Sequence, residues 1–545
     1  MKSLLLPTAL LLLLLCFSDN IYSARSFAVV GGTSRRLLAA KKFLLVGSTK
    51  LESLRLPIQL CMSTTTTAAA TMRGGKICLD NPLLQSWASQ PLRVPPFQEI
   101  ETHHFQPALE EGMRLELEDL QAIVDNPDEP TFDNVLAAYD RSGRVLEKVA
   151  SVYSNMCSSL CTEDLQEVQT TMSPILSRHS SKCMTLPGLF EKVDAVHQKR
   201  HSLGLNSEQL RLAERVHLDF TRAGATLSEE DKKEFADLKA ELASLTTQFQ
   251  QNVMKDEETY EMVLKNEDLK GCPDGLVQAA RQAAVERKKA DDEYVITLGR
   301  SLVEPFLTYS SRRDLRKQAF EAWTQRGELS KDRDNLQVAT KILRLRKRMA
   351  ELHDFPSFAH YQCVDSMAKT PDAVMKLLTN VWDLAKQSAQ REREDLEAFV
   401  KSSGEALEGG IQPWDWRYYA EKVRIKKYNF DESLLKPYLS LEKVTEALFA
   451  VSKNLYGLKY IERPDIQSYH PDVKTYEVRE ELEDGTDKLV AIFIHDNFAR
   501  KYKNSGAWMS EYRTQTKNLH PTADGDDDAY LGCLLGRYSD HFQQQ

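Results

Sequence analysis

The sequence predicts a mainly α-helical protein with one small β-structured segment. Leu, Ala, Glu and Lys are abundant, whereas only 23 of the 545 residues are Gly and 20 are Pro, a composition that favours helices. Apolar residues recur at three- and four-residue steps from Phe105 to about Ser468, and alternation with a period of two is confined to residues 473–495. A chain of this length can bury a large core, and we expect it to form two lobes or subdomains.

Composition and charge exclude several classes of protein. Apolar residues make up 42% of the chain and charged residues 28%, as in ordinary soluble globular proteins. The net charge of -9 argues against a nucleic-acid partner, which would require basic side chains massed on one face. Zinc-finger spacing, ribonucleoprotein motifs and phosphate-binding glycine loops do not occur.

The first 79 residues read as a targeting leader. Lys2 and the apolar run Leu4–Phe17 are typical of a signal peptide, which we place at residues 1–26, and the run is too short for a membrane span. Residues 27–79 are rich in Ser, Thr and basic side chains and are predicted to be a disordered, transit-like segment. The combination resembles the bipartite plastid presequences of algae with complex plastids. We expect an organellar protein, with the plastid suspected and the secretory pathway or the mitochondrion as alternatives, and no membrane association after leader removal.

Two long amphipathic helices have the clearest local signals. Ser228 and Asp231 indicate an N-terminal capping box, and Thr370-Pro371 supplies an N-cap and a proline at the first helical position. Gly404 is the expected end of the second helix. The apolar stripe of the first helix consists of Phe235, Leu238, Leu242, Leu245, Phe249 and Val253. The stripe of the second consists of Val374, Leu377, Leu378, Val381, Leu384 and Ala385.

A β-hairpin is predicted over residues 473–495. Residues Val473 to Val478 alternate in period two, Asp484-Gly485 supplies a turn, and Lys488–Ile494 is rich in β-forming residues. Two uses of such a hairpin remain open. In the first, the hairpin forms a small sheet that stabilises the packing of a lobe. In the second, it provides an edge strand near Ile492, and an extended peptide binds alongside that strand.

The nine cysteines do not form a disulfide framework. Cys157 and Cys161 lie one helical turn apart, and no C-x-x-C occurs. In a chain of this size we expect reduced and mostly buried thiols. A redox or metal-binding role of the Cys157/Cys161 pair is the alternative.

The segment 492–513 resembles part of a known peptidase family. Asp496, Arg500, Lys503 and Gly506-Ala507-Trp508 are similar to the segment that precedes the zinc helix in the thimet oligopeptidase and oligopeptidase A family of zinc metallopeptidases. Further similarities follow in the family's order over residues 81–518. They include Pro130 to Asn134, Asp219-Phe220, Arg222 to Ala225, Arg326-Gly327, Asp334-Asn335, Trp414-Asp415, Lys436 to Tyr438, Tyr456-Gly457 and His470 to Val473.

The resemblance implies a fold, an activity and a cofactor. Family members are helical and monomeric, and two lobes enclose a channel that admits short peptides. Zinc is held by both His of an H-E-x-x-H helix and by a downstream Glu, while the motif's Glu serves as the general base. Zinc lowers the pKa of its bound water toward ~7, and the base accepts the proton during attack on the peptide carbonyl.

None of the twelve His residues begins an H-E-x-x-H motif. His197 and His201 have the required spacing, but Gln198 stands where the base belongs, and the intervening Lys199 and Arg200 repel a dication. His179 with Cys183, also four residues apart, is an equally weak candidate. His353 and His360 lie seven residues apart, and no second His follows His495 at metal spacing. We therefore assign no catalytic, metal-binding or substrate-binding residue in this chain, and we expect no catalytic zinc to bind to it.

We expect residues 80–518 to form the helical oligopeptidase-like region and residues 519–545 to be a tail without similarity to the family. A truncated zinc oligopeptidase, inactive as written, is the first interpretation. The alternatives are a non-catalytic helical peptide-binding protein, which would keep the strand near Ile492, and a structural scaffold.

Overall fold

The computed structural model describes residues 80–429, 434–482, 484–504, 506–514 and 532–538. The predicted leader segments 1–26 and 27–79 lie outside the described residues, as does most of the segment 519–545.

The mainly α-helical prediction is confirmed. The principal helices are α4 (Phe105–Asp125), α5 (Ala138–Arg141), α6 (Arg144–Ser159), α7 (Glu163–Met184), α8 (Leu189–Lys199), α9 (Ser207–Arg222), α10 (Glu229–Thr259), α11 (Asp274–Glu286), α12 (Arg300–Tyr309), α13 (Arg313–Thr324), α14 (Asn335–Glu351), α15 (Phe358–Cys363), α16 (Pro371–Ser403), α17 (Trp416–Tyr428) and α18 (Leu441–Tyr456). The strands are β1 (Met262–Lys265), β2 (Glu293–Ile296), β3 (Leu458–Glu462), β4 (Lys474–Glu481), β5 (Asp487–Asp496), β6 (Ala507–Arg513) and β7 (Gly532–Tyr538).

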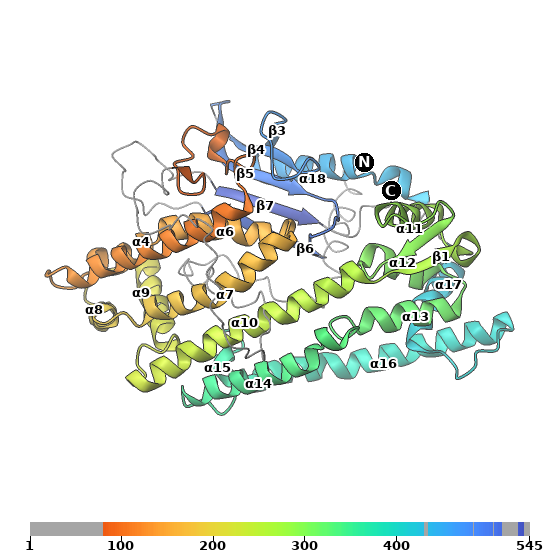
Figure 1. Ribbon diagram of the computed structural model, residues 1–545, viewed down its shortest axis with the longest axis horizontal. Coiled ribbons are helices and arrows are strands. Elements are labelled where there is room, and N and C mark those ends of the chain that lie inside the picture. Colours follow the sequence, from red (N-terminus) through yellow and green to blue (C-terminus); the bar gives the residue numbers. More distant parts are fainter. Residues whose placement is uncertain (1–79, 430–433, 483, 505, 515–531, 539–545) are drawn as a thin grey trace, which may run out of the picture.

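The long helices pack in successive layers. Helix α4 contacts α6 and α7, α7 contacts α10, and α10 contacts α14. In Figure 1, α10, α14 and α16 run along the long axis of the molecule, and the larger sheet with α18 lies above them.

Both predicted N-caps are present. The Ser228 hydroxyl accepts a hydrogen bond from the Asp231 backbone N–H at 3.1 Å, and the Thr370 hydroxyl accepts one from the Ala373 N–H at 3.2 Å. Gly404 ends α16 in the left-handed conformation at φ 74°, where glycine avoids the steric cost of a Cβ. Local sequence therefore determines where these two helices begin, and where α16 ends.

The predicted hairpin forms the centre of a five-stranded sheet. Strands β4 and β5 pair antiparallel, with Thr475 opposite Ile494, and Gly485 takes the turn at φ 80°. The strand order is β3-β4-β5-β7-β6, and β5 and β7 run parallel. The expectation of a peptide-accepting edge strand near Ile492 is wrong, because β5 has a hydrogen-bonded neighbour on each side.

The sheet is buried more fully than the alternation predicts. Thr475, Tyr476, Glu477 and Val478 are all buried, because α18 contributes Phe449 against Tyr476 on one face and α6 contacts the sheet at β6. The other five strands had no clear sequence signal: β3, β6 and β7, which join this sheet, and β1 and β2, which form a separate two-stranded antiparallel sheet.

No helix among the described residues is long and apolar enough to cross a membrane.

Candidate functional site

Asp496 is the centre of a buried charge network at the end of β5. Arg500 donates two hydrogen bonds to its carboxylate, both at 2.8 Å. Lys503 donates one at 3.0 Å, and the Tyr469 hydroxyl donates one at 2.7 Å. The side chains of Asp496 and Lys503 are both 0% exposed. The sequence pattern Asp496, Arg500 and Lys503 therefore encodes one closed ionic cluster.

The pKa values of Asp496 and of the adjacent His495 are both lowered, for different reasons. Burial opposes ionisation of Asp496, but the Arg500 hydrogen bonds and the charges of Lys503 and Arg500 outweigh it and lower the pKa of the carboxyl to about 2. Burial lowers the pKa of the adjacent His495 to about 4. Near neutral pH Asp496 is ionised and His495 is neutral.

The same segment is fastened to the end of α6. Arg500 donates to the Ser159 carbonyl at 3.0 Å, the Cys161 N–H donates to the Tyr502 carbonyl at 2.9 Å, and Asn504 N–H donates to the Ser158 carbonyl at 2.9 Å. Gly506 then turns the chain into β6 at φ 100°, a conformation that favours glycine. The family-like segment 492–513 thus joins the sheet to the helical layers, and Arg500 and Lys503 both pair with Asp496 within it.

The histidines singled out in the sequence do not form a zinc site of the family's kind. Helix α8 ends at Lys199, so His201 lies beyond it and does not share a helix face with His197. His353 stacks on Tyr361 at 5.2 Å between ring centroids, and His360 Nδ1 lies 2.9 Å from the Ser357 hydroxyl at the start of α15. These contacts are structural.

His197 instead meets a histidine from the next helix. Its ring stacks on that of His217 at 3.9 Å with an interplanar angle of 12°, and His217 Nε2 lies 2.9 Å from Asp194 Oδ1. The three residues are potential metal ligands by distance. However, the ring nitrogens' lone pairs lie in two nearly parallel planes, so one ion cannot lie in both planes, which makes this group a poor cation site as it stands.

A second group of potential ligands is buried between α4 and α7. Glu116 Oε2 lies 2.8 Å from His179 Nε2 and 3.8 Å from Cys183 Sγ, and Sγ lies 3.4 Å from Nε2. The sequence indicated only the i, i+4 pair of His179 and Cys183. Glu116 lies 63 residues before His179, and no local pattern connects the two, so only packing of α4 on α7 could reveal it.

The cysteine prediction is confirmed for the side chains that the structure describes. Cys157, Cys161 and Cys183 are buried, Cys272 and Cys363 are half-buried, and all five are free thiols. Burial raises the pKa of Cys157 well above its usual value. Because the thiolate is the reactive and metal-binding form, this counts against a redox or metal role of the Cys157/Cys161 pair.

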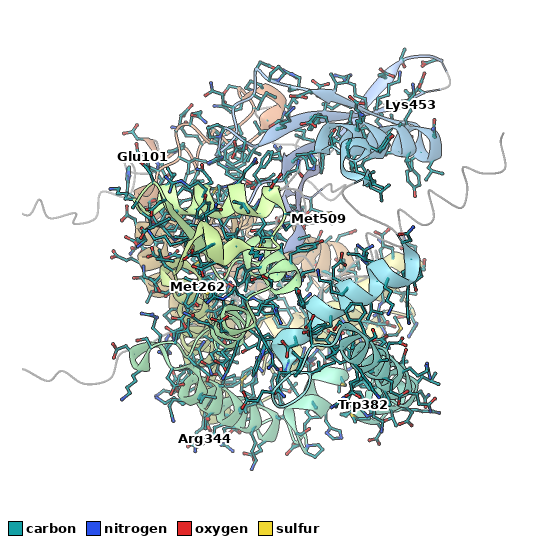
Figure 2. The ribbon with its side chains drawn as sticks, turned by 90° about the vertical axis from the view of Figure 1, so that its right-hand side faces the viewer. Glu101, Met262, Arg344, Trp382, Lys453 and Met509 are labelled. Carbon is teal, nitrogen blue, oxygen red and sulfur yellow. The ribbon has the colours of Figure 1, made fainter. Side chains whose placement is uncertain are left out.

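Helix α16 carries an uncovered apolar face. Leu378 is 54% exposed, Trp382 61% and Leu384 69%. The burial of α16 is confined to Leu396 and Val400 near its end. Helix α18 also exposes Leu448, Val451 and Leu455. In Figure 2, Trp382 on α16 and Lys453 on α18 lie at opposite ends of one side of the molecule, with Met509 of β6 between them. Large exposed apolar faces mark surfaces that bind another polypeptide or a ligand.

Comparison with known proteins connects this scaffold to peptidases. The model of the family described as Peptidase family M3 matches residues 306–533. Dipeptidyl carboxypeptidase of Escherichia coli is 35% identical over 447 residues, which are 81% of this chain and 64% of that protein. Oligopeptidase A of Escherichia coli is 29% identical over 467 residues. The organellar oligopeptidase A, chloroplastic/mitochondrial, of Arabidopsis thaliana is 27% identical over 452 residues, or 55% of its own length.

The chain spans 64% of the length of the Escherichia coli dipeptidyl carboxypeptidase and 66% of that of oligopeptidase A. The similarity covers the layered helices as well as the sheet, and the family is zinc-dependent in general. Together with the ordered motifs from Pro130 to Trp508, these matches support a thimet oligopeptidase and oligopeptidase A-like member of peptidase family M3.

Proposed function

We propose that this protein serves in the zinc-dependent hydrolysis of short peptides, and that the described residues supply the helical scaffold and part of the peptide-binding channel. The observation that carries the proposal is the 35% identity to a peptidase over 81% of the chain. The uncovered apolar faces of α16 and α18 support it, because a channel between two lobes requires surfaces that further polypeptide or a bound peptide covers.

The polypeptide of these 545 residues is not expected to cleave peptides by itself. It contains no H-E-x-x-H motif, and the zinc and its general base supply the attacking hydroxide in this chemistry. The assay uses the purified chain, added Zn²⁺ and a quenched fluorescent short peptide, with Escherichia coli oligopeptidase A as the positive control. Zinc-dependent cleavage by the purified chain would contradict this part of the proposal.

Transcript sequencing tests the connection to a complete peptidase. We expect an in-frame H-E-x-x-H codon run on the 3′ side of the codon for Asn518 in at least one transcript. If every transcript lacks it and the chain binds short peptides without turnover, the non-catalytic peptide-binding alternative is favoured. If neither a motif nor peptide binding is found, the protein is a scaffold.

Removal of dipeptides from peptide C-termini is a second candidate function. Identity is higher to the Escherichia coli dipeptidyl carboxypeptidase, at 35%, than to oligopeptidase A, at 29%. A transcript product that carries the zinc motif would distinguish the two. Successive dipeptide release from an unblocked peptide indicates the carboxypeptidase mode, whereas cleavage of a peptide blocked at its C-terminus indicates an endopeptidase.

We further propose that the protein is a monomer in an organelle, with the plastid as the first candidate. The signal-like segment 1–26 and the transit-like segment 27–79 support import, and one relative is named as chloroplastic/mitochondrial. A fluorescent protein fused behind residues 1–79 would report the compartment, and its secretion would contradict the proposal. Sedimentation of the purified chain would test the monomer.

A further inference from the structure

Glu116, His179 and Cys183 present three different ligand atoms to one point. The pairwise distances of Glu116 Oε2, His179 Nε2 and Cys183 Sγ are 2.8, 3.4 and 3.8 Å. Ligands bound to a tetrahedral zinc at ~2.0–2.3 Å lie roughly 3.3–3.8 Å from one another. Two of the three distances already have these values. The shorter one is the hydrogen bond that the Glu116 carboxylate accepts from His179 Nε2, which an ion would replace after a shift of about half an ångström.

The helices preorganise these ligands. His179 and Cys183 are separated by one turn of α7 and therefore share a face, and α4 brings Glu116 to that face. The carboxylate is enclosed from the opposite side, since a Cβ at Gly143 would come within 2.7 Å of Glu116 Oε1. Glu116, His179 and Cys183 are 8%, 9% and 6% exposed. A fixed, dry set of donors is what a metal site requires.

We propose that Glu116, His179 and Cys183 form a site for a thiolate-binding divalent cation, with Zn²⁺ as the expected ion, which fastens α4 to α7. Nitrogen, sulfur and carboxylate donors suit zinc and do not suit Mg²⁺ or Ca²⁺. Binding displaces the thiol proton of Cys183 to solvent, leaves His179 neutral and takes Glu116 as a carboxylate. Three protein ligands leave one coordination position for water.

The site has a structural purpose because it lies where two cores meet. Leu109 and Met113 of α4 belong to the core shared with the sheet, whereas Leu120 and Ile123 belong to the core formed with α8 and α9. Glu116 lies between these two stretches. Helix α7 is divided in the same way, and Cys183 belongs to the second core. A cation at this boundary would tie both cores together.

Lys239 of α10 is the group that opposes a cation here. It is buried and faces Cys183, and burial lowers its pKa to about 8. The Cys183 thiolate and the Glu116 carboxylate together carry two negative charges. A divalent ion balances them, so the loaded site is neutral and Lys239 weakens binding without preventing it.

Cobalt titration of the purified 545-residue chain, reduced and stripped of metal, tests the site. We expect one Co²⁺ per chain, a thiolate-to-cobalt charge-transfer band, visible bands of tetrahedral cobalt and their loss when Zn²⁺ is added. Cys183→Ser, His179→Gln and Glu116→Gln should each weaken Co²⁺ binding at least about 100-fold, since even indirect contacts to a metal are worth about 10–100-fold. Zn²⁺ should raise the Tm of the wild-type chain and not that of Cys183→Ser.

Two variants serve as matched controls. Cys161→Ala removes another buried thiol, and His217→Ala removes the stacked pair near Asp194. Both should keep the cobalt spectrum. Circular dichroism checks the helical fold of each variant, and Glu116→Gln, which preserves side-chain shape, replaces Cys183→Ser if the latter does not fold. The proposal fails if no thiolate-to-cobalt band forms, or if the band survives Cys183→Ser, since the three side chains then form only a hydrogen-bonded cluster. The proposed peptidase function does not depend on either result.

Discussion

Helices α10 and α16 have similar lengths, 31 and 33 residues, similar N-caps and similar apolar stripes, yet opposite burial. On α10, Phe235, Leu242 and Leu245 are buried against α14, in a core with Val338 and Ile342. On α16, the corresponding stripe from Leu377 to Leu384 is more than half exposed. An amphipathic pattern therefore predicts a helix and its apolar face, but it does not determine whether another part of the protein packs against that face.

Charged groups show the same contrast between the packed interior, here the end of β5, and the exposed helix α16. The packed region holds Asp496 at 0% exposure between Arg500 and Lys503. Helix α16 carries exposed pairs such as Arg393 with Glu397, 2.9 Å apart. Buried ion pairs become costly when one partner is removed, whereas exposed pairs contribute little.

The largest effect is expected from Asp496→Asn. It leaves Arg500 and Lys503 buried without their counter-charge, and should lower the free energy of unfolding by about 3–5 kcal/mol at pH 5. In the wild type the carboxyl has a pKa of about 2 in the folded state and 3.8 in the unfolded state. Its stabilisation is therefore complete above pH 3.8 and is lost as the pH falls toward 2. In urea titrations, the difference in the free energy of unfolding between wild type and Asp496→Asn should narrow by about 2 kcal/mol as the pH falls over that window.

Glu397→Gln on α16 is the control for this experiment. Its effect on unfolding should stay within about 0.5 kcal/mol and should not change over the same pH window. If both variants lose the same free energy of unfolding, burial of the Asp496 network does not make it more important for stability than an exposed ion pair.

Leu242→Ala compared with Leu378→Ala tests the apolar stripes directly. Leu242 is buried, so its truncation removes buried methyl groups and leaves a cavity, which should cost about 2–5 kcal/mol. Leu378 is 54% exposed, and its truncation should change stability by no more than about 0.5 kcal/mol. The measurement is the urea midpoint of each purified variant. A large loss for Leu378→Ala would show that the α16 face is covered in solution, for instance by a second copy of the chain.

The smallest difference between α10 and α16 is expected from their two N-caps. Ser228→Ala should cost about 1 kcal/mol, because the cap of α10 begins a helix that is packed along its length. Thr370→Ala removes an equivalent hydrogen bond, but α16 is mostly unpacked over its first turns, so fraying there should cost only a few tenths of a kcal/mol. Equal losses, measured by urea unfolding, would indicate that both helices unfold with the core.

Local features of the fold could be predicted to the residue. The caps at Ser228 and Thr370, the end of α16 at Gly404 and the turn at Gly485 follow from backbone geometry and short-range hydrogen bonds. The short strands β1, β2 and β3 were missed because four or five residues carry too little periodicity to distinguish strand from loop. The ordered motifs were enough to recognise the peptidase family.

Less of the candidate site could be predicted from the sequence. The pairs His179 with Cys183 and His197 with His201 have the same spacing, but only the first lies on one helix and meets a third ligand. Glu116, Asp194 and His217 join these groups through packing of helices far apart along the chain. The Asp496 cluster was visible as a motif, and only the hydrogen bond from Arg500 to the Ser159 carbonyl shows that it fastens β5 to α6.

By itself the sequence determined that the chain is mainly helical, where α10 and α16 begin, that a hairpin forms near residues 473–495, and that the chain resembles a peptidase. The helix starts and the hairpin depend on neighbours within a few residues, and the resemblance depends on the order of short motifs. Only the tertiary structure decided that β5 lies inside the sheet, that most of the α10 stripe is covered while the α16 stripe is exposed, and that Glu116 meets His179 and Cys183. Burial and ligand geometry depend on which distant surfaces meet, and no local pattern contains that information.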